Sequence, residues 1–228
     1  MCQTKSFTGV AIFLVCVLPF VLSSCQGPVE VSREPSVGYQ INRLLVLPFK
    51  DMMRAHGENA TLRNPISGKV FTTGKVEEDA DVFLLEQLLL KLNERKDLYL
   101  IPASQAQGVL ARLLSESKTE PSELELTVKT GKALRADAVL VGYLYCFRDR
   151  AGRNYTVDTP ASVVFSLDLI QVKDAKVIWG SHYNETQRSL SDDLFQIGKF
   201  IKRKGKWITV REMAVSGIEE VFQTFPKP

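Results

Sequence analysis

The sequence has few of the side chains on which enzymes and metal sites depend. It contains two histidines, His56 and His182, which show neither i, i+4 spacing nor neighbouring cysteines. Metal ligands usually occur at such short spacings. Asp168 and His182 can be imagined in a catalytic Ser-His-Asp set, but no G-x-S-x-G motif supplies the nucleophile. The sequence therefore predicts a non-catalytic protein that uses no metal and no cofactor.

A phosphate-binding loop is also missing. Residues 68–75 (GKVFTTGK) combine two glycines with a lysine. However, five residues rather than four separate Gly68 from Gly74, and Val76 occupies the position where a Ser or Thr would bind magnesium. The segment therefore predicts a polar hairpin or loop. A hydrolase or nucleotide-dependent enzyme with its site in this part of the chain is the rival hypothesis.

Long hydrophobic runs are scarce, and the clearest one lies near the start of the chain. Residues 10–22 (VAIFLVCVLPFVL) carry no charge. A membrane-spanning helix needs roughly 20 apolar residues, and Pro19 would kink this one. Because the run follows a short segment whose single charge is Lys5, it is typical of a signal peptide. We expect residues 1–24 to be removed.

The end of this run, Leu22-Ser23-Ser24-Cys25, resembles the lipobox of bacterial lipoproteins. The resemblance implies that the Cys25 sulfur receives a diacylglyceryl group, that the signal is cut before it, and that the new amine is acylated. A thiol in a core or at the end of a signal helix is the alternative. Gln26 is not the aspartate that retains such proteins at the inner membrane. The resemblance thus implies an anchor in the outer membrane, with the domain facing the periplasm.

The number of cysteines left after processing excludes an internal disulfide. If Cys2 and Cys16 leave with the signal and Cys25 is acylated, only Cys146 keeps a free thiol. The mature chain of 204 residues is long enough to be held by packing alone. Residues 25–40 contain two prolines and little apolar periodicity, so we interpret them as a lipidated tether before a domain at 41–228. The net charge of +3 gives no case for nucleic acid, and the oligomeric state stays open.

The apolar patterns predict an α/β (α+β) fold: a single compact domain with a mixed sheet packed with helices. Strands are expected at residues 42–49, 97–102, 138–147, 162–172 and 177–186. Helices are expected at residues 77–94, from 104, at 122–135, at 190–201 and at 209–225.

Finer features of these elements are also predicted. Ser104, Ser122 and Thr209 each precede a Gln or Glu by three residues, which is the spacing of a capping box. Apolar and polar side chains alternate in residues 162–172. This alternation predicts a strand with one face toward the core and the other toward water or a helix edge. In the next strand Val177, Trp179 and Tyr183 are expected on one face, paired antiparallel through a hairpin at 173–176. We interpret Trp179 as a core residue rather than a ligand platform.

Three stretches resemble a group of periplasmic α/β domains: residues 44–49 (LLVLPF), 133–142 (ALRADAVLVG) and 167–180 (LDLIQVKDAKVIWG). The group includes the amino-terminal domain of the Tol-Pal translocation protein, the curli-secretion lipoprotein and lipoprotein activators of penicillin-binding proteins. The resemblance implies an accessory or assembly lipoprotein that binds another envelope protein. A subunit of an envelope export or secretion complex is the alternative, although the polar tract at residues 154–159 does not resemble a pore-forming hairpin.

Two segments are candidates for recognition. Residues 52–75 form a long glycine-containing connection, and such loops either bind something or are disordered. Its candidate interaction residues are His56, Arg63, Lys69, Phe71 and Lys75. The second segment is a basic patch of Lys199, Lys202, Arg203, Lys204 and Lys206. It predicts either contact with anionic headgroups or an ordinary solvated helix end.

Overall fold

A mixed six-stranded sheet forms the centre of the protein. The computed structural model describes residues 40–117, 119–153, 156–187 and 209–226. Five strands lie in the order β10-β9-β6-β1-β5, and a short β2 (Lys50–Asp51) pairs with β6. These strands are β1 (Arg43–Val46), β5 (Tyr99–Ile101), β6 (Ala138–Arg148), β9 (Ser162–Gln171) and β10 (Lys176–Thr186). β1, β5 and β6 run parallel, whereas β6, β9 and β10 are antiparallel.

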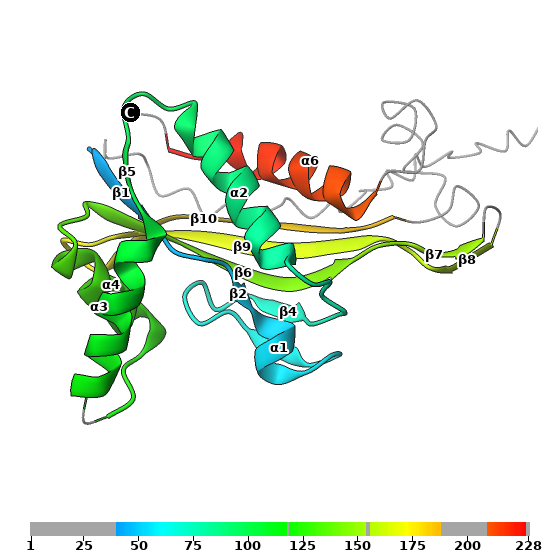
Figure 1. Ribbon diagram of the computed structural model, residues 1–228, viewed down its shortest axis with the longest axis horizontal. Helices are drawn as coiled ribbons and strands as arrows, with labels where there is room; N and C mark the ends of the chain where they lie inside the picture. The colour runs from blue at the N-terminus through cyan, green and yellow to red at the C-terminus, as the bar shows by residue number, and fades with distance from the viewer. Residues whose placement is uncertain (1–39, 118, 154–155, 188–208, 227–228) are drawn as a thin grey trace, which may run out of the picture. The chain divides into compact units, whose positions relative to one another are not determined.

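Helices cover both faces of this sheet. α2 (Ala80–Asn93) and α6 (Val210–Phe222) lie on one face, and α1 (Met52–His56), α3 (Ala103–Glu116) and α4 (Glu123–Ala133) lie on the other (Figure 1). A small hairpin of β3 (Thr61–Arg63) and β4 (Val70–Thr72) joins the second layer. The α/β fold class and the mixed sheet predicted from the sequence are therefore confirmed.

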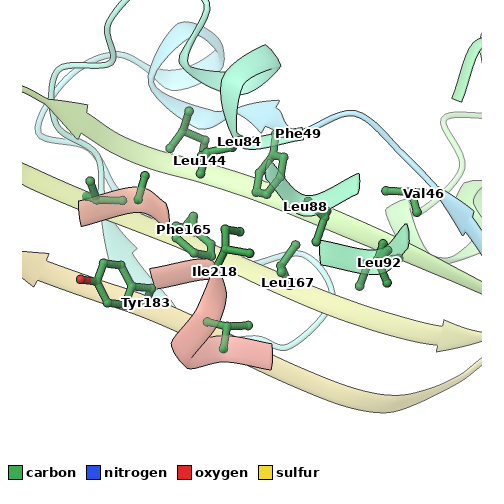
Figure 2. Packing of buried hydrophobic residues seen from close by; sticks show 14 of the residues in the cluster. Val46, Phe49, Leu84, Leu88, Leu92, Leu144, Phe165, Leu167, Tyr183 and Ile218 are labelled. Carbon is green, nitrogen blue, oxygen red and sulfur yellow. The ribbon is translucent and has the colours of Figure 1, made fainter. Parts of the chain in front are cut away.

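The first core lies between the sheet and helices α2 and α6. Leu84, Leu88 and Leu92 follow one stripe of α2 and are almost fully buried. They meet residues of β6 and β9 such as Leu144 and Phe165 (Figure 2). The apolar pattern of residues 77–94 predicts a stripe of Val82, Leu85, Leu89 and Leu92, with Leu84 and Leu88 beside it. The structure corrects the centre of this stripe, because Val82 is 49% exposed while Leu84, Leu88 and Leu92 fasten α2 to the sheet.

The second core lies on the opposite face, under α1, α3, α4 and the hairpin. Its buried residues include Tyr143 and Tyr145 of β6, Met52 of α1, Phe71 of β4 and Val128 of α4. Since β6 points alternate side chains into the two cores, ten of its eleven residues are buried. The strand predicted at residues 138–147 is confirmed, and its burial is that of a central strand that is apolar on both faces.

The helix starts agree with the capping prediction at two of three positions. Ser122 accepts a hydrogen bond from the Glu125 amide, and Thr209 with Glu212 forms a complete capping box. The prediction for Ser104 is wrong. α3 already begins at Ala103, with Pro102 at the N-cap position and no side-chain cap. Proline suits a helix start because its missing N–H is not needed there.

Two details of β9 and β10 correct the sequence interpretation. Ser166 and Asp168 of β9 do not face water, since both are buried under the hairpin. On β10, the register shifts between Val177 and Trp179. This bulge sends Val177 to the second core while Trp179 and Tyr183 pack in the first. One inserted residue moves every side chain before it to the opposite face of the strand. The prediction that Val177 shares a face with Trp179 and Tyr183 is therefore wrong.

The segment at residues 52–75 is folded, because it forms α1, β3 and β4. Residues 151–159 add a second small hairpin, β7 (Ala151–Arg153) with β8 (Thr156–Thr159). The helix predicted at residues 190–201 lies outside the described residues. Within the described ranges, no helix is long and apolar enough to cross a membrane.

Candidate functional site

The turn between β3 and β4 is organised by the side chain of Asn64. Its Oδ1 accepts hydrogen bonds from the amides of Ile66 (2.7 Å) and Ser67 (2.8 Å). Its backbone amide donates to the Lys69 carbonyl at 2.7 Å, which closes the turn. Gly68 completes it at φ 72°, in the left-handed region where glycine is favoured. The segment at residues 68–75, predicted to be a polar hairpin or loop, thus belongs to a hairpin whose turn is held by the hydrogen bonds of Asn64.

The other end of the Asn64 amide fastens this turn to the sheet. Asn64 Nδ2 lies 2.9 Å from Ser166 Oγ, 3.2 Å from the Tyr145 hydroxyl and 3.2 Å from Asp168 Oδ2. Asn64 is 1% exposed, so these bonds are shielded from water. Buried polar groups are costly unless they are paired, and this set is paired across two sheets. We call Asn64, Tyr145, Ser166 and Asp168 the buried polar cluster.

Asp168 is the one acidic member of the buried polar cluster. Burial raises the pKa of this carboxyl to about 6, against the opposing effects of the Asn64 hydrogen bond and of Lys69. Its Oδ1 lies over Gly180 of β10, where a Cβ would stand only 2.9 Å away. The glycine therefore leaves the space that the carboxyl occupies.

Lys69 and Phe71 of the hairpin extend this contact toward β10. Lys69 Nζ lies 3.4 Å from His182 Nδ1. The Phe71 ring stacks on Tyr145 with centroids 4.3 Å apart, and meets the edge of His182 at 5.8 Å. Burial and the Lys69 charge lower the pKa of His182, so its neutral ring accepts a hydrogen bond from the lysine.

Tyr143 lies on the same face of β6, two residues before Tyr145. Its hydroxyl is buried and has no hydrogen-bond partner among the described residues. Burial, with a smaller effect of Glu123, raises the pKa of Tyr143. The two tyrosines thus lie on the same face of β6, but of the two hydroxyls only that of Tyr145 has a hydrogen-bond partner in the described structure.

The outer side of the hairpin is exposed, because side chains alternate along both strands. Leu62 and Phe71 pair across the hairpin and point inward. Thr61, Arg63, Val70 and Thr72 point outward, and 56% of Val70 is exposed. Together with the exposed Lys69, these outward residues form what we call the hairpin face.

The base of the hairpin is fixed by a buried threonine. Thr73 is 2% exposed, and its hydroxyl donates to the Gly57 carbonyl at 2.7 Å and accepts from the Ala60 amide at 2.8 Å. These bonds hold the chain after α1 against the strand end. His56, which precedes Gly57, and Lys75, which follows Thr73, are both exposed there.

The structure separates the five predicted interaction residues by position. Arg63 and Lys69 lie on the hairpin face, and His56 and Lys75 lie at its base. Phe71 is 6% exposed and belongs to the second core, so it supports the hairpin and is not presented on its surface. Cys25 and the basic patch at Lys199, Lys202, Arg203, Lys204 and Lys206 lie outside the described residues.

The sequence interpretation missed the buried polar cluster. Asn64 precedes Pro65, a pair of residues that favours a turn, and Asp168 is an acid inside an otherwise apolar strand. Each signal was present, but their pairing across 104 residues was not visible. Within the described ranges, no group of three or more His, Cys, Asp or Glu side chains is placed to hold a metal ion.

Comparisons with known proteins give likenesses in structure. No protein-family model matches the chain, and no curated protein matches it. It is similar to PelC of Paraburkholderia phytofirmans, a dodecamer, at 14% identity and a TM-score of 0.46, over 85% of this chain and 93% of PelC. It is also similar to the LpoB C-terminal domain of Escherichia coli at 15% identity and a TM-score of 0.40, over 66% and 87% of the two chains.

A third similar structure is lipoprotein GNA1162 of Neisseria meningitidis, at 13% identity and a TM-score of 0.38, over 71% of this chain and 91% of that protein. The lipobox itself stays a prediction from the sequence.

Proposed function

We propose that the protein is a non-catalytic lipoprotein of the bacterial envelope, anchored through Cys25, whose domain binds another envelope protein through the hairpin face. The observation that carries this proposal is the construction of the hairpin. Its inner side is locked to the sheet by Asn64, while its outer side presents Arg63 and Val70 to solvent. Lys69 is exposed at the edge, where its ammonium meets His182. A surface that is already ordered loses little conformational entropy on binding.

The chemistry of the hairpin face indicates the kind of partner. Arg63 and Lys69 contribute two cations, and Lys75 at the base of the hairpin adds a third near His56. Val70, an exposed apolar residue, pairs with Arg63 across the hairpin and follows Lys69 in the chain, so it is next to both cations. An acidic protein surface with a small apolar centre is complementary to this arrangement.

The buried polar cluster supports a structural role rather than a catalytic one. Asp168 is 1% exposed and is enclosed by Asn64 and the hairpin, so a substrate has no path to its carboxyl group. His182 is engaged by Lys69 rather than by a nucleophile. The enzyme hypothesis requires turnover to depend on Lys75 or His182, and no paired reacting groups lie between these two residues in the described part of the chain.

The anchor is supported by the lipobox resemblance and by simple energetics. Each buried methylene contributes about 0.8 kcal/mol, so two or three acyl chains hold a protein at a membrane where one does not. Anchoring also raises the local concentration of the domain near its partner. We place the anchor in the outer membrane, facing the periplasm, because Gln26 rather than aspartate follows Cys25.

Metabolic labelling with a palmitate analogue, followed by membrane fractionation, tests the anchor. The expected result is label in the outer-membrane fraction, lost on Cys25→Ala. A Cys25→Ala protein that still takes up label would refute the lipobox assignment, and label confined to the inner membrane would refute the location.

Co-purification from mildly solubilised envelopes tests the partner. We expect a protein that is captured by the wild type and lost from Arg63→Glu/Lys69→Glu. The matched control is Lys96→Glu/Arg112→Glu, which makes the same charge change at exposed positions on other elements. Capture that survives the hairpin change, or that is lost equally in the control, argues against the hairpin face. A stoichiometric assembly that contains several copies of this chain favours the export-complex alternative.

A further inference from the structure

A second exposed feature lies where the chain enters the domain. A surface hollow of about 420 Å³ is lined by Gln40, Lys132, Arg135, Asp137, Gln171 and Lys173, with Ala136 and Val172 at its apolar side. These residues come from the segment before β1, the end of α4 and the turn after β9. We call it the entry hollow.

The entry hollow is rich in groups that bind anions. The side chains of Lys132, Arg135 and Lys173 are exposed, and none makes an ion pair with any residue that the structure describes. The amides of Gln40 and Gln171 add neutral donors. Three unpaired cations and two amides around one concavity match the oxygens of a phosphate group.

The one acidic residue of the hollow is already engaged. Asp137 Oδ2 accepts hydrogen bonds from the backbone amides of Asn42 (3.0 Å) and Arg43 (2.8 Å). These bonds fasten its carboxylate to the start of β1. These hydrogen bonds stabilise the carboxylate of Asp137 within the domain. The net charge of the residues that line the hollow stays positive.

The frame of the hollow is rigid. Arg135 has a left-handed backbone at φ 53°, and its carbonyl accepts a hydrogen bond of 2.8 Å from Arg43 Nε. Beneath it, Gly131 packs so closely that a Cβ would stand 2.6 Å from Val172 and 2.7 Å from Val139. The backbone that carries Lys132 and Arg135 is therefore fixed by packing and hydrogen bonds, and their side chains extend from it into solvent.

The position of Gln40 relates the hollow to the membrane. Residue 40 is the first described residue, and 14 residues lie between it and Cys25. A chain of that length reaches about 50 Å when fully extended and about 20 Å as a flexible coil. With acyl chains on Cys25, the hollow lies at the root of the tether, where the domain is held nearest to the headgroups.

We propose that the entry hollow binds the headgroup phosphate of an anionic phospholipid and so sets which side of the domain faces the membrane. This proposal rests on the proposed anchor at Cys25. It gives the domain two distinct surfaces, since the entry hollow binds lipid and the hairpin face binds protein. Each cation close to an anionic surface strengthens membrane partitioning by about fivefold.

Vesicle flotation of the unlipidated mature chain, residues 25–228 with Cys25→Ser, tests this proposal. Vesicles of phosphatidylcholine alone are compared with vesicles that contain about 30% phosphatidylglycerol, an anionic content in the range where basic proteins bind. The variant Lys132→Gln/Arg135→Gln/Lys173→Gln removes the three cations. The matched control, Arg63→Gln/Lys69→Gln/Lys75→Gln, removes three cations from the hairpin and its base.

We expect the wild type and the hairpin variant to bind anionic vesicles, and the hollow variant to bind roughly 100-fold more weakly. Equal binding by the hollow variant, or an equal loss in both variants, would overturn the proposal. Residues 199–206 are unchanged in both proteins and cannot produce a difference between them.

Titration of the wild type with inorganic phosphate distinguishes a lipid from a free anion. We expect no saturable binding below millimolar phosphate. Tight phosphate binding combined with unchanged vesicle binding by the hollow variant would assign the hollow to a soluble phosphate and overturn the lipid proposal. Because the assay contains neither acyl chains nor a protein partner, its failure is distinguishable from failure of the proposed function.

Discussion

Asn64 in the β3–β4 turn and Asp168 in β9 are joined by a buried hydrogen bond of 3.2 Å across 104 residues of sequence. The same Asn64 side chain shapes the turn through Oδ1 and binds the sheet through Nδ2. One residue therefore connects the local conformation of the hairpin to its place on the domain. The hairpin face depends on this link.

Replacing Asn64 with alanine should destabilise the domain. The change removes the two turn bonds and leaves the Asp168 carboxyl without its amide donor, for which we expect a loss of about 2–3 kcal/mol in the free energy of unfolding. Urea denaturation followed by circular dichroism measures it. Asn93→Ala, at an exposed position, is the control and should stay within about 0.5 kcal/mol. Similar values for the two variants would contradict the locking role.

Asp168 predicts a pH dependence with a definite sign. Its folded pKa of about 6 exceeds the value of about 3.9 expected in the unfolded chain, so between these values the native state binds the proton more tightly. The free energy of unfolding of the wild type, minus that of Asp168→Asn, should therefore increase as the pH falls from 7 toward 4. Linkage limits the gain to about 3 kcal/mol.

Urea denaturation of the wild type and Asp168→Asn at several pH values measures this difference. His182 has a lowered pKa and titrates in the opposite sense, but it is present in both proteins and cancels. Parallel stability curves for the two proteins would show that Asp168 ionises with an ordinary pKa.

The two tyrosines of β6 should respond differently to the same change. Tyr143→Phe removes a buried hydroxyl without a partner in the described structure, so stability should stay equal or rise by up to about 1 kcal/mol. Tyr145→Phe removes the acceptor of a bond from Asn64 and should cost about 1 kcal/mol. Thermal unfolding of the two variants side by side gives the comparison, and a reversed order would contradict the assigned hydrogen bonds.

Two helical glycines provide a second matched pair. A Cβ at Gly217 of α6 would stand 2.6 Å from the Tyr183 ring, whereas nothing lies within 4 Å of a Cβ at Gly108 of α3. Gly217→Ala should cost about 1–3 kcal/mol through overpacking. Gly108→Ala should stabilise by up to about 1 kcal/mol through helix propensity. If both variants gained stability in urea denaturation, the close approach of α6 to β10 would be in error.

The elements with strong periodicity could be predicted from the sequence. The helix α2, the strand β6 and the capping box at Thr209 each depend on neighbours in the chain, and each is confirmed. Fold class followed from their order. Local patterns of this kind can be interpreted from the sequence, because the residues that make the pattern are the ones whose burial stabilises the helix or strand.

The candidate site could not be predicted in the same way. Ser166 and Asp168 alternate with apolar residues as the solvent side of a strand does, and only the hairpin shows that this side is covered. The buried hydrogen bond between Asn64 and Asp168 produces no pattern in the sequence. Taken alone, Asn64 is typical of a turn and Asp168 of an exposed strand position. The bulge after Val177 is likewise set by pairing with β9 rather than by local sequence.

In-cell photocrosslinking from the hairpin face shows directly whether this surface contacts a protein partner. A photoreactive amino acid at position 70 is compared with the same residue at position 114, because Val70 and Leu114 are similarly exposed, at 56% and 52%. We expect one adduct of defined mass from position 70 that is absent from position 114. An adduct from position 114 alone, or none from position 70 in cells where the protein reaches the membrane, would contradict this expectation.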